Sequence, residues 1–149
     1  MVEIDDELHK LDQDGTIKML AMEAYSMAEK FGQHASGEIG AAIKLTVLAH
    51  FGATDQRAFP VLVAPGQLKK FVSGNGGIKK EMMPKEILKR WSMDFNDTNI
   101  AEAYGLARIA YAVDAGPEMP IFQQDVVKAL AGRTEFDPTA SRRLVRVGK

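Results

Sequence analysis

The chain has 149 residues, of which 46% are hydrophobic and 26% are charged, and its formal net charge is −1. This composition is typical of a globular protein, and the length suits a single domain over residues 1–149. The sequence contains no cysteine. Disulfide frameworks, thiolate zinc sites, iron–sulfur clusters and a cysteine nucleophile are therefore excluded.

The sequence predicts neither a membrane helix nor a signal peptide. Its longest segment without a charged side chain covers residues 58–68, which is shorter than the roughly 18 apolar residues that a transmembrane helix needs. The N-terminal segment MVEIDDELHK is acidic and has no apolar core, unlike a secretory signal. We expect a protein of a reducing, intracellular compartment that has no membrane partner.

Charge is distributed unevenly along the chain. An acidic head over residues 1–16 carries six acidic side chains and one lysine, whereas residues 69–90 carry seven basic and two acidic side chains. A basic tail follows over residues 133–149. Positive charge over residues 69–90 can bind the phosphates of a nucleic acid or can form a solvated helix face, and charge alone leaves both interpretations open.

The predicted elements alternate between strands and helices. The first half predicts a short helix at 5–11, a strand at 17–27, a loop at 28–35, a helix from the N-cap Ser36 to Gly52, and a strand at 59–63. The second half predicts helical turns at 67–72, a glycine-rich loop at 73–77, a helix with Pro84 in its first turn that ends at Trp91, and helices at 99–113 and 123–130. This order predicts an α/β fold, with a short central sheet flanked by helices.

Two carboxylates are candidates for chemistry. Glu23 interrupts an apolar predicted strand, where it is either buried with a partner or placed at the exposed end of the strand. Glu102 lies in the first turn of the predicted helix at 99–113, close to Asp97 and Asn99. Acids in a first turn can simply complement the helix dipole. Carboxylates from a strand and from a helix start can also hold Mg²⁺, which prefers oxygen ligands.

Other motifs are less specific. The SGNGG loop at 73–77 is flanked by lysines and suits a nucleic-acid backbone, but no Walker motif follows it. The histidines His9, His34 and His50 have no recognised metal-ligand spacing in the sequence, so we expect them to have structural roles.

The order of four segments resembles the RuvC-like Holliday-junction resolvases of the RNase H-like superfamily, in particular phage-type members. These segments are MLAMEAYSM, SGEIGAAIKLTVLAHFG, VLVAPGQLKKFVSGNGGIKKEMMPKEILKRW and DTNIAEAYGLARIAY, and the resemblance covers residues 17–113. It implies a truncated RNase H-like (RuvC-type) fold and binding of branched DNA.

The resemblance also implies roles for individual residues. Glu23 corresponds to the metal-binding glutamate of the central strand, and Glu102 to a helix carboxylate where aspartate is usual. Asp97 or Asn99 is then a neighbouring ligand of Mg²⁺ or Mn²⁺, or a residue that orients such a ligand. The implied catalytic residues are Glu23, Asp97 and Glu102. Lysines near the DNA are implied at Lys69, Lys70, Lys79 and Lys80.

One departure from the family affects the expected activity. The family begins with a three-stranded meander whose first strand carries a metal-bridging aspartate, and no segment of this sequence replaces that meander. Loss of the meander exposes an edge of the strand around Glu23. A second copy of the chain, a partner chain that supplies the missing strands, or a rearranged N-terminus should cover this edge, and we expect a homodimer or a partner chain. The resemblance also implies the cytoplasm of a bacterial or phage-infected cell.

Two functions remain open from the sequence. The first is a Mg²⁺-dependent endodeoxyribonuclease that cuts Holliday junctions once the missing aspartate is supplied. The second is a non-catalytic DNA-binding or assembly protein on a truncated resolvase scaffold.

Overall fold

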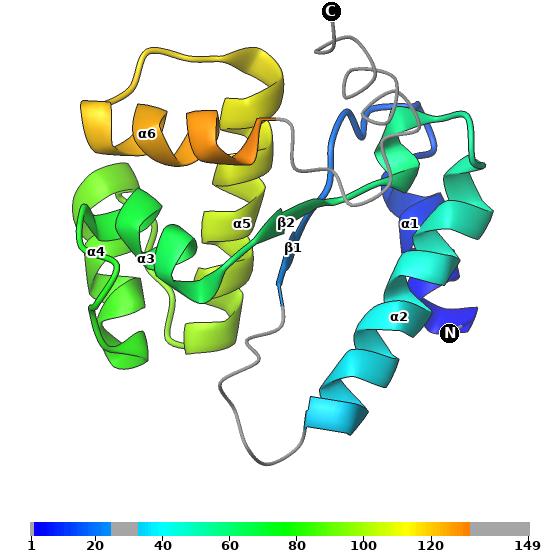
Figure 1. Ribbon diagram of the computed structural model, residues 1–149, viewed down its shortest axis with the longest axis horizontal. Coiled ribbons are helices and arrows are strands. Elements are labelled where there is room, and N and C mark those ends of the chain that lie inside the picture. The colour runs from blue at the N-terminus through cyan, green and yellow to red at the C-terminus, as the bar shows by residue number, and fades with distance from the viewer. Residues whose placement is uncertain (1, 25–32, 132–149) are drawn as a thin grey trace, which may run out of the picture.

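A two-stranded parallel sheet links the two halves of the molecule (Figure 1). The computed structural model describes residues 2–24 and 33–131. Strand β1 (Ala21–Glu23) pairs with β2 (Val61–Val63), so that Ala21 lies opposite Val61 and Glu23 opposite Val63. Parallel strands require a long crossover, and α2 (Gln33–Phe51) and the 3₁₀ turn η1 (Gln56–Ala58) lie within it. The predicted α/β class is confirmed.

Most of the core lies on one side of this sheet, where four helices pack against one another (Figure 1). In chain order these are α3 (Pro65–Ser73), α4 (Met83–Trp91), α5 (Thr98–Ala115) and α6 (Ile121–Leu130), with the 3₁₀ turn η2 (Lys80–Met82) before α4. Their fully buried side chains include Leu68, Val72, Met83, Ile87 and Ile109. Packing in this core fixes the position of α5 and therefore of the residues at its start.

Helices α3 and α5 approach closely because Gly105 has no side chain. A Cβ atom at this position would lie 2.9 Å from Cδ1 of Leu68 and 3.2 Å from Cγ2 of Val72. Close packing at Gly105 thus fixes α5 against α3, and with it the position of the α5 N-terminus.

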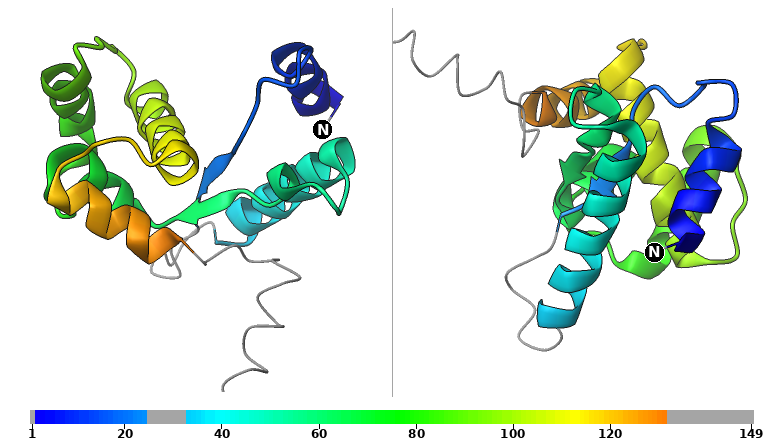
Figure 2. Two further views of the ribbon diagram at one scale, coloured as in Figure 1. Left: turned by 90° about the horizontal axis from the view of Figure 1, so that it is seen from above. Right: turned by 90° about the vertical axis from the view of Figure 1, so that its right-hand side faces the viewer.

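The other half of the molecule consists of α1 (Val2–Leu11) and α2, which lie beyond the strands (Figure 2). Leu8 and Val47 are buried in this half. Helix α2 keeps apolar side chains in solvent, since Ile39 and Leu45 are each 60% exposed.

Arg57 connects the turn after α1 to η1. Its guanidinium binds the Asp55 carboxylate through two nitrogens, at 2.7 and 3.0 Å, and its Nη1 lies 2.9 Å from Oδ2 of Asp12. The hydrogen bond from Arg57 holds the pKa of Asp55 below its usual value, and the same bond raises the pKa of Arg57. The predicted acidic head is therefore tied to the body of the protein through Asp12.

The predicted helices agree well with the structure, whereas the first predicted strand is too long. Among the described residues β1 covers only three, because Pro60 and Pro65 bracket its partner β2 and limit the ladder. The prediction of Ser36 as an N-cap is wrong, since α2 already begins at Gln33. Pro84 lies in the first turn of α4, as predicted. Residues 25–27 of the predicted strand and the predicted basic tail lie outside the described residues.

Candidate functional site

The candidate site is formed where the end of β1 meets the start of α5. Glu23 is the last residue of β1 and its side chain is exposed, so the second of the two sequence interpretations applies. Asp97 is the N-cap of α5, and its Oδ1 accepts hydrogen bonds from the main-chain nitrogens of Asn99 at 2.7 Å and Ile100 at 3.0 Å. Glu102 follows one turn later, with a side chain that is 15% exposed.

Lys80 places a positive charge among these oxygen-bearing side chains. Its Nζ lies 2.8 Å from Oε2 of Glu102 and donates a hydrogen bond to Oδ1 of Asn99 at 2.9 Å. The hydrogen bond to Glu102 raises the pKa of Lys80 against the opposing effect of burial, and the negative charges of Glu102, Glu23 and Asp97 add to the increase. The structure thus brings Glu102 and Asn99 into contact with one ammonium group, and the charges of Glu23 and Asp97 also act on it. We call these four side chains and Lys80 the acid–lysine cluster.

The turn before Lys80 is built by local hydrogen bonds. Gly74 has a φ of 87° and ends α3 in the left-handed conformation that favours glycine. Oγ of Ser73 then accepts from the main-chain nitrogen of Asn75, and Oδ1 of Asn75 accepts from that of Gly77. A Cβ atom at Gly76 would lie 2.9 Å from the main-chain oxygen of Gly66. The glycines therefore allow the chain to reverse tightly and bring Lys80 to α5.

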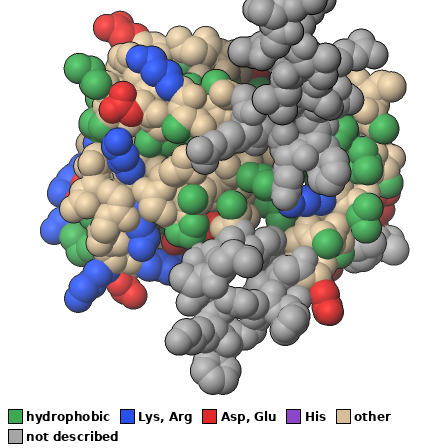
Figure 3. Space-filling model, viewed as in Figure 1, with side chains coloured by type: hydrophobic (Ala, Val, Ile, Leu, Met, Phe, Trp, Pro, Cys, Tyr) green, Lys and Arg blue, Asp and Glu red, His purple; other side chains and the backbone are tan. Residues whose placement is uncertain are grey.

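The other predicted DNA-binding lysines lie on an adjoining face. Lys69 and Lys70 are in α3 and Lys79 is exposed directly before η2. Nζ of Lys70 lies 3.9 Å from Oδ2 of Asp125, and both side chains are well exposed. Figure 3 shows Lys and Arg side chains gathered over the part of the molecule where α3 and α4 lie. We call the side chains of Lys69, Lys70, Lys79 and Lys85 the lysine face, in which Lys79 and Lys85 are exposed and Lys69 is half-buried.

The acid–lysine cluster does not fit Mg²⁺ in this arrangement. Magnesium requires oxygen ligands in near-octahedral geometry, but the ammonium of Lys80 lies next to the carboxylate of Glu102. Moreover, among the described residues only Asp5, His9 and His50 form a group of three possible ligands whose atoms all lie within 4.8 Å of one another. Glu23, Asp97 and Glu102 lie in one region, but their carboxylate oxygens do not meet this distance and so do not form a compact cation site.

Two groupings were missed from the sequence. The spacing of Asp5 and His9, four residues apart in a predicted helix, already indicated that they share a helix face. Neither the approach of His50 to this pair nor the contact of Arg57 with Asp12 leaves a local sequence signal, because each joins residues that are 45 positions apart.

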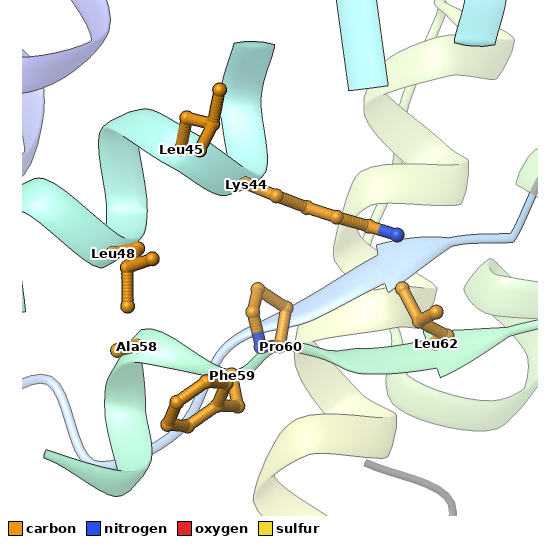
Figure 4. Close-up of a pocket in the computed structure, with 7 residues that line it drawn as sticks. All are labelled: Lys44, Leu45, Leu48, Ala58, Phe59, Pro60 and Leu62. Atoms are coloured by element: carbon orange, nitrogen blue, oxygen red, sulfur yellow. The ribbon is translucent and has the colours of Figure 1, made fainter. Parts of the chain in front are cut away.

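A separate apolar pocket of about 300 Å³ lies between α2 and β2 (Figure 4). Leu45, Leu48, Phe59 and Leu62 contribute to its wall, and the side chain of Lys44 extends along one side. None of the sequence-predicted site residues lines it.

Among the described residues, no helix is both long enough and apolar enough to cross a membrane. Comparisons of the chain with protein-family models, with curated proteins and with solved structures found no match. The resemblance to RuvC-like resolvases therefore rests on the sequence motifs quoted above.

Proposed function

We propose that the chain is a resolvase-like protein with an RNase H-like (RuvC-type) scaffold that binds branched DNA through the lysine face. In this proposal the isolated chain binds the junction without cutting it. The family resemblance supplies the substrate class, and the surface chemistry of α3, η2 and α4 supports it.

The observation that carries the proposal is the contrast between two consecutive lysines. Both side chains are exposed, but Nζ of Lys80 is bound to Glu102 and Asn99, whereas Lys79 belongs to the lysine face. The boundary between the positive face and the acid–lysine cluster therefore runs between adjacent residues. A phosphate backbone bound at Lys79 would therefore lie next in the chain to the lysine that holds Glu102.

Lys80 favours the non-catalytic version. Its ammonium neutralises the carboxylates that a divalent cation would need, and no third compact ligand is present among the described residues. Cleavage with Mg²⁺ or Mn²⁺ would first require the ion pair between Lys80 and Glu102 to break. It would also require a partner chain to supply a further carboxylate. Junction cleavage is the second candidate function, and it depends on such a partner.

The open edge of β1 supports assembly with a second copy of the chain. Within the described sheet β1 pairs only with β2, and a groove of about 630 Å³ runs beside β1, along α5. Met19 and Ala21 line one side of the groove, and Leu106, Ala110 and Tyr111 line the other. A strand added at such an edge gains main-chain hydrogen bonds and covers apolar side chains.

A competition experiment tests the proposed function. A labelled immobile four-way junction is bound to the full chain and displaced by unlabelled junction or by linear duplex of the same length and base composition. We expect the junction to compete at least about tenfold better than the duplex at one fixed salt concentration, because non-specific phosphate binding depends strongly on salt. Equal competition would refute the branched-DNA preference.

A gel assay of the same junction with Mg²⁺ or Mn²⁺ separates the two versions. We expect intact junction from the isolated chain. Efficient cutting that is lost in Glu23→Gln would show that the acid–lysine cluster opens without a partner, and would replace the non-catalytic version by the nuclease.

A further inference from the structure

A cluster of two imidazoles and one carboxylate joins α1 to α2. Nδ1 of His50 lies 2.9 Å from Oδ1 of Asp5, and Nδ1 of His9 lies 3.5 Å from the same oxygen. The His9 and His50 rings meet edge to face, with centroids 4.3 Å apart. Asp5 and His9 belong to α1 and His50 to α2, so the cluster depends on the tertiary fold.

The donor separations match those of a small tetrahedral metal ion. Zinc binds imidazole nitrogen and carboxylate oxygen at about 2.0–2.2 Å, which places two ligands of one tetrahedral ion about 3.3 Å apart. The two nitrogen–oxygen distances, 2.9 and 3.5 Å, lie on either side of this value, and the ligand atoms of all three residues lie within 4.8 Å of one another. Small side-chain rotations are therefore sufficient to surround an ion.

The surroundings hold one ligand rigidly and leave another accessible. The side chain of His50 is 8% exposed, and its ring also meets that of Phe51 edge to face at 4.6 Å. The side chain of His9 is 68% exposed, and Nδ1 of His9 lies 2.9 Å from the main-chain oxygen of Asp5. An ion could thus enter from solvent on the His9 side and keep water as a fourth ligand.

We infer that Asp5, His9 and His50 form a binding site for a divalent transition metal ion of the zinc type. The ion takes the place of the protons that the two Nδ1 atoms direct toward oxygen, and each imidazole then binds in its neutral form with its remaining proton on Nε2. Mixed nitrogen and oxygen ligands favour Zn²⁺, Co²⁺ or Ni²⁺ over Mg²⁺. The bound ion clips the acidic N-terminal helix to α2.

The test uses the full chain without an added histidine tag. Titration calorimetry with Zn²⁺ at neutral pH should show one site per chain, and Co²⁺ should give the visible absorption bands of a tetrahedral complex. His9→Ala removes a ligand that is mostly exposed, so the fold is expected to persist, and affinity should fall at least about tenfold. His50→Ala should have the same or a larger effect. Excess Mg²⁺ should not displace the ion.

His34→Ala is the matched control, because it removes another histidine of α2 that lies 16 positions before His50, about 24 Å along a helix. It should bind Zn²⁺ as the unchanged chain does. The inference is overturned if the unchanged chain binds no Zn²⁺, if folded His9→Ala binds it equally well, or if His34→Ala loses it. These results do not depend on DNA binding.

Discussion

Nζ of Lys80 lies 2.8 Å from Oε2 of Glu102, so the start of α5 and the turn before α4 are held together by an ion pair. Glu102 is shielded from solvent, with a side chain that is 15% exposed, whereas that of Lys80 is 46% exposed. The same ammonium also donates to Asn99. This pair is the feature that distinguishes the candidate site from an open carboxylate site.

Replacing Lys80 by Met should weaken the fold slightly, by about 0.2–1 kcal/mol, because a half-exposed ion pair is screened by water. The pKa of Lys80 is raised in the folded state. The contribution of the ion pair to stability is therefore complete at pH values below 10.5, the ordinary pKa of lysine. It is lost as the pH rises through the raised pKa of Lys80. Urea unfolding of both proteins should show a constant difference from pH 7 to 9 and a smaller difference above pH 10.5.

Lys79→Met is the control for this comparison, since it removes the neighbouring charge outside the acid–lysine cluster. It should alter stability by less than about 0.5 kcal/mol. A difference for Lys80→Met that disappears between pH 7 and 9 would contradict the assigned role of the ion pair.

Arg57→Ala should loosen the attachment of the N-terminal helix. The guanidinium binds both Asp55 and Asp12, so its loss frees the turn after α1. The pKa of Asp55 is lowered in the folded state. The stabilisation by the Asp55–Arg57 pair is therefore present at pH values above 3.8, the ordinary pKa of aspartate, and is lost as the pH falls through the lowered pKa. Hydrogen exchange at neutral pH should be faster over residues 2–17 in the variant than in the unchanged chain.

The control is Arg108→Ala, which removes a guanidinium that lies over the Trp91 ring, away from α1. It should leave the exchange of residues 2–17 unchanged. Equal exchange in Arg57→Ala and the unchanged chain would show that α1 is held by its contacts with α2 alone.

The sequence predicted those features that depend on neighbours along the chain. Apolar residues at helical spacing located α5, and the restricted backbone of Pro84 located the start of α4. The grouping of Asp97, Asn99 and Glu102 followed from their places in one helix start. Local patterns of this kind determine where a helix begins and which residues share its first turn.

Other features depend on tertiary contacts and were not predictable. The contact of Lys80 with Glu102 is one of them, because a lysine on a turn can point in more than one direction. The place of Lys80 near DNA, together with Lys79, stays a prediction. The length of β1 depends on a partner strand some 40 residues later, as the pairing of Ala21 with Val61 shows. The meeting of His50 with Asp5 likewise requires two helices to pack.

Gly105→Ala should destabilise the protein by about 1–3 kcal/mol, because the new methyl group would overlap Leu68 and Val72 in a packed core. Thermal unfolding monitored by circular dichroism measures the effect. Gly66→Ala is the matched control, since the nearest atom to its Cβ would be 3.9 Å away. A Gly105→Ala protein as stable as Gly66→Ala would mean that α3 and α5 separate easily.

Among the described residues β1 pairs with β2 alone, and this predicts self-association through its other edge. Light scattering at micromolar concentration should give a dimer or a larger species, and Ala21→Pro should shift it toward monomer by removing a main-chain donor from the strand edge. Circular dichroism shows whether the variant remains folded. A stable monomer of the unchanged chain would contradict assembly with a second copy, and would leave a different partner chain as the occupant of the edge.

The most direct test of the account is the salt dependence of four-way-junction binding, measured by fluorescence anisotropy for two charge-matched variants. Lys69→Glu combined with Lys79→Glu alters the lysine face, whereas Lys10→Glu combined with Lys18→Glu makes the same charge change in the N-terminal part of the chain. The first variant should bind more weakly, and its plot of log affinity against log salt should be flatter by about one unit for each lost phosphate contact. The second should bind like the unchanged chain. Equal affinities and slopes for both variants would contradict DNA binding through the lysine face.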